Sequence, residues 1–181
     1  MIFIIIGNTC AGKSTFMNYV LNEYRLAPIK QYTTRKKRNE GDQEYVFVSP
    51  SEMKKTEFVH LKKYNGNLYG VAKESLDAAD TESKILITDY ATARAIKKEY
   101  QAEIIYLCTP LTVRLKRICS RGNGRNKKRI FLDLFYSWEI FFADKVIYNN
   151  KTILNLEGKA RDYFDKKMEH TKNTDLCEGR G

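Results

Sequence analysis

The chain opens with an apolar, β-branched run, MIFIII at residues 1–6, which is followed directly by the glycine-containing segment GNTCAGKS at residues 7–14. A short, continuous apolar run is typical of a strand that is buried on both faces of a parallel sheet. The apolar residues Phe16, Val20, Leu21 and Tyr24 then recur at helical spacing within residues 14–25. A buried strand, a glycine turn and a helix in this order predict an α/β fold.

The glycine turn at residues 7–14 fits the pattern G-x-x-x-x-G-K-[ST], which binds the phosphates of a nucleoside triphosphate. Its glycines let several backbone N–H groups point at phosphate oxygens, and the helix that follows adds the positive end of its dipole. We expect Lys13 to reach the β- and γ-phosphates, and Ser14 to be the metal ligand for Mg²⁺, which arrives as the ATP complex. The predicted ATP-binding residues of this turn are Gly7, Asn8, Thr9, Cys10, Ala11, Gly12, Lys13, Ser14 and Thr15.

The rest of the chain continues the alternation of strands and helices, which predicts a parallel sheet flanked by helices. The expected strands are residues 26–31, 84–88, 103–108 and 144–148, and the expected helices are residues 92–100, 111–120, 131–142 and 156–168. We interpret residues 1–168 as a single domain with a core formed by residues 1–31 and 84–168. Two segments break the alternation and are predicted to be a small insertion at 32–83 and a basic lid at 121–130. The polar residues 169–181 are predicted to form a disordered tail.

The composition limits the classes of function. The chain has 181 residues and a net charge of +10, which favours anionic partners such as nucleotides. Its longest apolar run, at residues 1–6, is far shorter than the roughly 20 residues of a membrane span. No signal peptide is recognisable, so we expect a cytoplasmic protein with no membrane partner. The four cysteines form no C-x-x-C pair, which argues against a zinc site or a disulfide framework.

Several ordered motifs resemble the guanylate kinase family, a group of P-loop nucleoside monophosphate kinases. They are TTRKKR at 33–38, EYVFVS at 44–49, EFVH at 57–60, GNLYG at 66–70, a strand that ends in Asp89, RICSRG at 117–122 and DKVIYNN at 144–150. The resemblance runs from about residue 2 to residue 168. It implies a P-loop NMP-kinase fold with an acceptor-binding insertion and a lid, and it implies ATP-dependent phosphorylation of a nucleoside or deoxynucleoside monophosphate. GMP or dGMP is the default acceptor.

The resemblance also assigns roles to residues. Arg35 and Arg38 have planar, charged guanidinium groups, which can bind a phosphate through two hydrogen bonds at once. Tyr45 and Tyr69 can donate hydrogen bonds from neutral O–H groups. In the family the corresponding residues hold the acceptor phosphate. The alternatives are a solvated charge run for the arginines and core packing for the tyrosines.

Three further positions are predicted from the strand ends and the lid. Asp89 is expected to hold Mg²⁺ through water or to orient the acceptor, with a simple helix N-cap as the alternative. Arg121 and Arg129 are the expected catalytic arginines of the lid, with Arg125 as the alternative to Arg129 and a basic surface loop as the alternative to a lid. Asn149 is expected near the donor base, as in the family.

The predicted base pocket departs from the family pattern. Gln31, His60 and Val71 stand where the family usually has Ser, Glu and Ser or Thr. A neutral histidine has one acceptor and cannot satisfy both the N1–H and the amino group of guanine. A pyrimidine or modified deoxynucleoside monophosphate is therefore the alternative acceptor, with His60 accepting from N3–H, Gln31 donating to O4 and Val71 forming an apolar wall. The P-loop also departs at Cys10, where the family usually has Gly.

Two other classes of function remain. Non-catalytic relatives of these kinases keep the fold and lose the P-loop lysine or the acceptor arginines, all of which are present here. A nucleic-acid binder is the other class, but the chain has no motif for it, so no specific nucleic-acid partner is expected. We expect a monomer or a homodimer.

Overall fold

The computed structural model describes residues 1–37, 44–77, 83–120 and 137–178, with side chains up to residue 169. The core sheet has five parallel strands in the order β2-β7-β1-β8-β9. The strands are β1 (Ile2–Ile6), β2 (Ala27–Pro28), β7 (Lys84–Ile87), β8 (Ala102–Cys108) and β9 (Lys145–Tyr148). The apolar run of β1 lies at the centre of this sheet, and β2 and β9 form its two edges. This confirms the α/β class and the parallel sheet.

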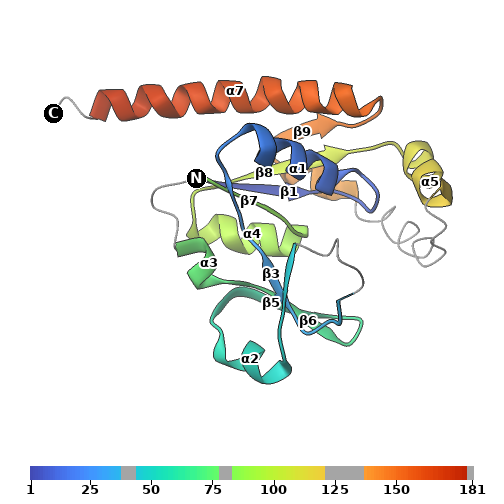
Figure 1. The fold of residues 1–181 in the computed structure, drawn as a ribbon, viewed down its shortest axis with the longest axis vertical. Helices are drawn as coiled ribbons and strands as arrows, with labels where there is room; N and C mark the ends of the chain where they lie inside the picture. Colours follow the sequence, from blue (N-terminus) through green and yellow to red (C-terminus); the bar gives the residue numbers. More distant parts are fainter. Residues whose placement is uncertain (38–43, 78–82, 121–136, 179–181) are drawn as a thin grey trace.

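Helices cover both faces of the core sheet (Figure 1). They are α1 (Lys13–Glu23) and α7 (Ile153–Glu178) on one face and α4 (Tyr90–Glu99) on the other, while α5 (Leu111–Ser120) lies beyond the carboxyl end of the strands and a short 3₁₀ helix, η1 (Ser137–Phe142), contacts β8. Alternate residues of β1 point to opposite faces, as the period of a strand requires. Phe3 and Ile5 pack with residues of α1 and α7, and the aromatic rings of Phe3 and Phe164 lie 4.9 Å apart. Ile4 packs on the other face with residues of α4.

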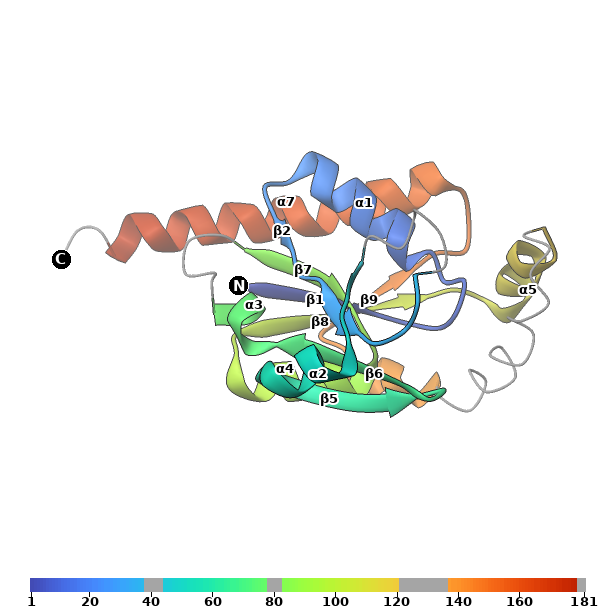
Figure 2. The same cartoon turned by 60° about the horizontal axis from the view of Figure 1, so that its bottom comes forward.

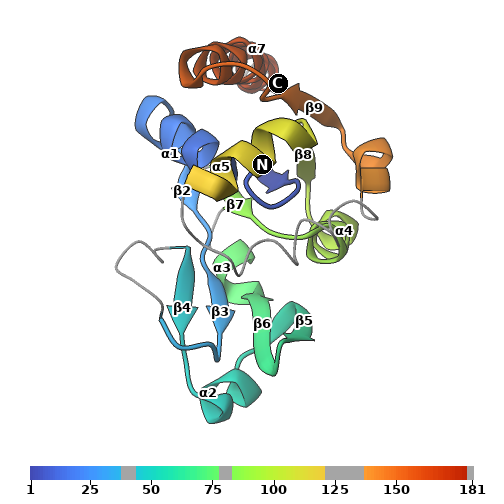
Figure 3. The ribbon, with the colours of Figure 1, turned by 90° about the vertical axis from the view of Figure 1, so that its right-hand side faces the viewer.

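A second sheet forms the insertion. Its strands β3 (Gln31–Thr33), β4 (Tyr45–Phe47), β5 (Phe58–Tyr64) and β6 (Asn67–Ala72) lie in the order β4-β3-β6-β5, as Figure 3 shows. The short helices α2 (Pro50–Lys55) and α3 (Lys73–Asp77) complete it. Turning the molecule brings this sheet in front of the core (Figure 2). The β5–β6 hairpin turns at Asn65 and Gly66, which both have positive φ, and an Asn-Gly pair favours such a turn.

The sequence prediction was wrong at two element boundaries. Residues 26–31 do not form one strand, because β2 belongs to the core sheet and β3 to the insertion sheet. The bonding to β7 ends at Ile29, whose N–H donates to the Ile85 carbonyl at 2.8 Å, and Gln31 then pairs with β4 of the insertion sheet. Helix α7 does not end near residue 168 but continues to Glu178. No Pro or Gly interrupts the sequence between Gly158 and Gly179, so nothing in that stretch breaks a helix.

Two other expectations fall partly or wholly outside the described residues. The predicted helix at 131–142 is described only from Ser137 onward, where it is the 3₁₀ helix η1. The predicted lid at 121–130 lies outside the described residues. Among the helices that are described, none has the length and apolar character to cross a bilayer.

Candidate active site

The P-loop follows β1 and turns through three residues with positive φ: Gly7 at 141°, Cys10 at 61° and Gly12 at 95°. Gly7 is required by space as well, because a Cβ there would lie 2.6 Å from the carbonyl oxygen of Leu107 in β8. Gly12 is the N-cap of α1, and as a glycine it has no side chain that could accept from the N–H groups of the first helical turn. These N–H groups are therefore left for an anion, as phosphate-binding turns require.

Lys13 lies over the P-loop. Its Nζ donates to the carbonyl oxygens of Gly7, at 2.7 Å, and Asn8, at 3.0 Å. The ammonium group therefore sits at the mouth of the turn, at the position from which a lysine reaches the phosphates of a nucleotide. Thr15 is exposed on α1.

Residues from three later segments brace the back of the P-loop. The Ala11 carbonyl accepts from Asn149 Nδ2 at 2.8 Å and from Thr109 Oγ1 at 2.9 Å. Arg117 donates to the Cys10 carbonyl at 3.1 Å and to Asn149 Oδ1 at 3.3 Å. Asn149 thus lies directly beneath the P-loop, and its predicted role near the donor base stays a prediction.

Sequence reasoning missed two of these bracing residues, Thr109 and Arg117. Thr109 directly follows β8, the neighbour of β1, so its place at the carboxyl edge of the sheet was a usable signal. Arg117 is the first residue of the RICSRG motif at 117–122, which was also a usable signal, but its contact with the P-loop depends on how α5 packs.

The residue expected to bind Mg²⁺ contacts the insertion. Ser14 Oγ donates to Glu44 Oε1 at 2.6 Å, although the two residues are 30 positions apart in the chain. Mg²⁺ takes both hydroxyl and carboxylate oxygens as ligands, so these two side chains fit this metal. Glu44 was not predicted as a site residue.

The expected phosphate-gripping residues gather on the insertion sheet. Arg35 is 9% exposed, and its guanidinium carbon lies 5.0 Å from the ring centre of Tyr45 and 5.3 Å from that of Phe47. The rings of Tyr45 and Tyr69 are 6.2 Å apart. The structure therefore brings Arg35, Tyr45 and Tyr69 together, while Arg38 lies outside the described residues, as do Arg121, Arg125 and Arg129.

The expected base-pocket residues take different positions. Gln31 is buried and its amide nitrogen donates to the Ile87 carbonyl in β7. Val71 is fully buried in the apolar cluster between the insertion and the core, so in this conformation it contributes packing. His60 is half-buried on β5, and its Nδ1 lies 3.0 Å from Thr92 Oγ1.

A hydrogen-bond chain fixes the proton on His60. The hydroxyl of Thr92 donates its one hydrogen to Asp89 Oδ2 at 2.9 Å. It must therefore accept from His60, so Nδ1 carries the proton and Nε2 of the neutral ring has a free lone pair. His60 consequently presents an acceptor on the side of the ring away from Thr92.

Asp89 is the N-cap of α4, since its carboxylate also accepts from the Thr92 N–H at 3.3 Å. It forms an ion pair with Lys62 of β5. Burial on its own raises the pKa of this carboxyl, but the charge of Lys62 and the hydrogen bonds from Lys62 and Thr92 outweigh it and lower the pKa. The N-cap alternative is therefore correct as a structural role, and the role toward Mg²⁺ or the acceptor stays a prediction.

Comparisons with known proteins agree with this architecture. A family model described as guanylate kinase matches residues 1–151. A guanylate kinase of Thermotoga maritima is 28% identical, over 98% of this chain and 92% of that protein. The human guanylate kinase is 29% identical over 48% of each chain. The crystal structure of guanylate kinase from Anaplasma phagocytophilum superposes with a TM-score of 0.70 and 20% identity, over 92% of this chain and 85% of that one, and shows the shared fold.

Proposed function

This chain belongs to the guanylate kinase family, and on that premise we propose that it transfers the γ-phosphate of ATP to a nucleoside monophosphate, with GMP or dGMP as the default acceptor. One observation supports this most directly. Two consecutive residues at the start of β4 link the two halves of the site, because Glu44, just before the strand, contacts Ser14 of the P-loop, and Tyr45, its first residue, packs on Arg35. One short stretch of chain therefore connects the triphosphate-binding turn with the cluster expected to hold the acceptor phosphate.

The reaction needs alignment and charge neutralisation rather than a covalent intermediate. An oxygen of the acceptor phosphate attacks the γ-phosphorus, the bond from the γ-phosphorus to the β–γ bridging oxygen breaks, and ADP leaves. Lys13 and the N–H groups of the P-loop stabilise the charge on the donor phosphates. Arg35 holds the acceptor phosphate. Mg²⁺ held at Ser14 supplies further neutralisation when the nucleotide is bound.

The proposed activity is tested by ADP release with ATP–Mg²⁺ and each common ribo- and deoxynucleoside monophosphate. Lys13→Ala is the matched blank, because it removes the ammonium and keeps the loop backbone. We expect turnover with at least one acceptor and none above background in the variant. A non-catalytic interaction module would give no turnover with any acceptor, and equal rates in the two proteins would refute the role of Lys13.

A pyrimidine or modified deoxynucleoside monophosphate is the second candidate acceptor. It is favoured by the tautomer of His60, because one acceptor at Nε2 matches the single N3–H of a uracil-type base. Gln31 uses one amide hydrogen on Ile87, and its second hydrogen is the donor that O4 of such a base needs. Guanine presents two donors where His60 has one acceptor, and each unpaired buried donor costs about 1–3 kcal/mol.

His60→Glu separates the two acceptors. It restores a carboxylate, so kcat/KM for GMP relative to dTMP should rise about 5- to 150-fold, which corresponds to the cost of one unpaired donor. His60→Gln is the control, since it offers one acceptor like the native ring. An unchanged ratio in His60→Glu would show that His60 does not read the base.

A further inference from the structure

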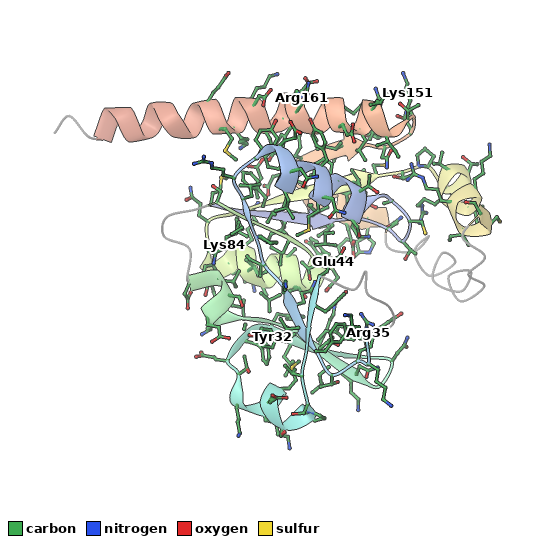
Figure 4. All side chains as sticks on the ribbon, viewed as in Figure 1. Tyr32, Arg35, Glu44, Lys84, Lys151 and Arg161 are labelled. Atoms are coloured by element: carbon green, nitrogen blue, oxygen red, sulfur yellow. The ribbon has the colours of Figure 1, made fainter. Side chains whose placement is uncertain are left out.

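Glu44 holds an unusual position for an acidic residue. Its backbone carbonyl accepts from the Gln31 N–H at 3.1 Å, which fixes it at the edge of the insertion sheet, and its side chain reaches the Ser14 hydroxyl at 2.6 Å. In Figure 4 it lies at the junction between the insertion and the core, above Arg35. The insertion thus places a carboxylate at the first turn of α1.

This position creates an electrostatic conflict with the proposed substrate. The first turn of α1 has no acidic residue of its own, as expected for a turn that receives phosphates. A carboxylate beside the β- and γ-phosphates repels them unless a cation lies between the two groups. The geometry therefore calls for a cation that both the carboxylate and the phosphates share.

We propose that Glu44 is a second protein ligand for the Mg²⁺ of the ATP complex, acting beside Ser14 but supplied by the acceptor-binding insertion. Magnesium takes six oxygen ligands in near-octahedral geometry at about 2.0–2.1 Å, which puts neighbouring ligand oxygens about 2.9 Å apart. The oxygens of Ser14 and Glu44 are already 2.6 Å apart, close to that separation. The proposal rests on the proposed kinase function, which supplies the ATP.

A consequence for the acceptor site follows from the chain connection. Glu44 directly precedes Tyr45, and Tyr45 packs on the guanidinium of Arg35. A metal bound by Glu44 restrains this end of β4, and with it the residues that grip the acceptor phosphate. Loading of the donor site with ATP–Mg²⁺ therefore favours the acceptor-binding arrangement, whereas ATP without metal does not.

The test measures binding rather than turnover. The affinity of a non-hydrolysable ATP analogue is determined by calorimetry in excess EDTA and again in Mg²⁺, for the native chain, Glu44→Gln and Glu57→Gln. Glu57 is the charge-matched control, since it lies on the insertion and pairs with Lys73 at the surface. In Glu44→Gln we expect the gain in affinity on adding Mg²⁺ to fall at least about tenfold, while the affinity in EDTA is unchanged or higher. Glu57→Gln should match the native chain.

The other outcomes overturn the proposal in distinct ways. If Glu44→Gln binds the analogue more tightly in both media, Glu44 competes with phosphate and is not a metal ligand. If Glu44→Gln equals the native chain in both media, Glu44 has no role toward the metal, and the kinase function stands. If the native chain binds no analogue in either medium, the proposed function fails and this proposal fails with it.

Discussion

The ion pair between Lys62 and Asp89 ties the insertion sheet to the core, and its contribution to stability can be predicted. Lys62→Met removes the ammonium and keeps most of the apolar stem. The two side chains are 32% and 37% exposed, so solvent screens part of their attraction. Fully exposed pairs contribute about 0.2–1 kcal/mol, and breaking fully buried pairs costs about 3–5 kcal/mol. We therefore expect a coupling of about 1–2 kcal/mol in the free energy of unfolding.

The coupling is measured by a double-mutant cycle in urea at pH 7 with Lys62→Met, Asp89→Asn and the double variant. Asparagine is a good N-cap, so Asp89→Asn removes the charge and preserves the cap of α4. The surface pair of Lys73 and Glu57 is the control, and its coupling should be below about 0.5 kcal/mol. A coupling below about 0.2 kcal/mol at low salt would refute this reasoning.

The same pair predicts a direction for acid unfolding. The pKa of Asp89 in the folded chain is below its ordinary value of 3.8. Its stabilisation is therefore present above that value and is lost as the pH falls through the lower, folded pKa. Without the Lys62 charge, burial remains and raises the pKa, so the acid-unfolding midpoint of Lys62→Met should move to higher pH. A midpoint that stays in place would show that Lys62 is not the counter-ion.

Three more changes have defined outcomes. Gly12→Ala puts a side chain at φ 95° and a Cβ 2.6 Å from Asn149 Nδ2, so the melting temperature should fall and ATP–Mg²⁺ should no longer raise it. Arg35→Lys replaces a planar fork between two rings with a point charge, so KM for the acceptor should rise at least about tenfold while KM for ATP stays within about twofold in steady-state assays. Phe164→Ala opens a cavity at a fully buried position and should cost about 3–5 kcal/mol in urea unfolding, with both KM values unchanged.

The parts of the fold that the sequence predicts well are those set by local pattern. The run at β1 and the turn that follows it carry their own signals, because burial on both faces and positive φ restrict the residue types that can stand there. The break between β2 and β3 was missed because residues 26–31 were interpreted as one strand. Periodicity does not say which sheet each half joins, and only the tertiary contacts decide it.

The site shows the same division. Lys13 and Ser14 are predictable because the motif fixes their neighbours in the chain. Glu44 was missed because the EYVFVS motif at 44–49 assigned a role to Tyr45 and none to Glu44, and its contact with Ser14 depends on how the insertion folds over the core. Val71 was expected beside a ligand but is fully buried, since alternation along a strand gives the face of a residue and not what covers that face.

The two edges of the core sheet differ in a way that bears on aggregation. An edge strand exposes backbone groups that can recruit a strand from another molecule. At one edge, β2 is two residues long and ends in Pro28, which has no N–H to offer. At the other edge, Lys159 donates to the carbonyl of Tyr148 at 2.6 Å, and Lys145 brings a charge to the start of β9. Both edges are thus poor templates for a foreign strand, so copies of the chain can crowd together without joining their core sheets.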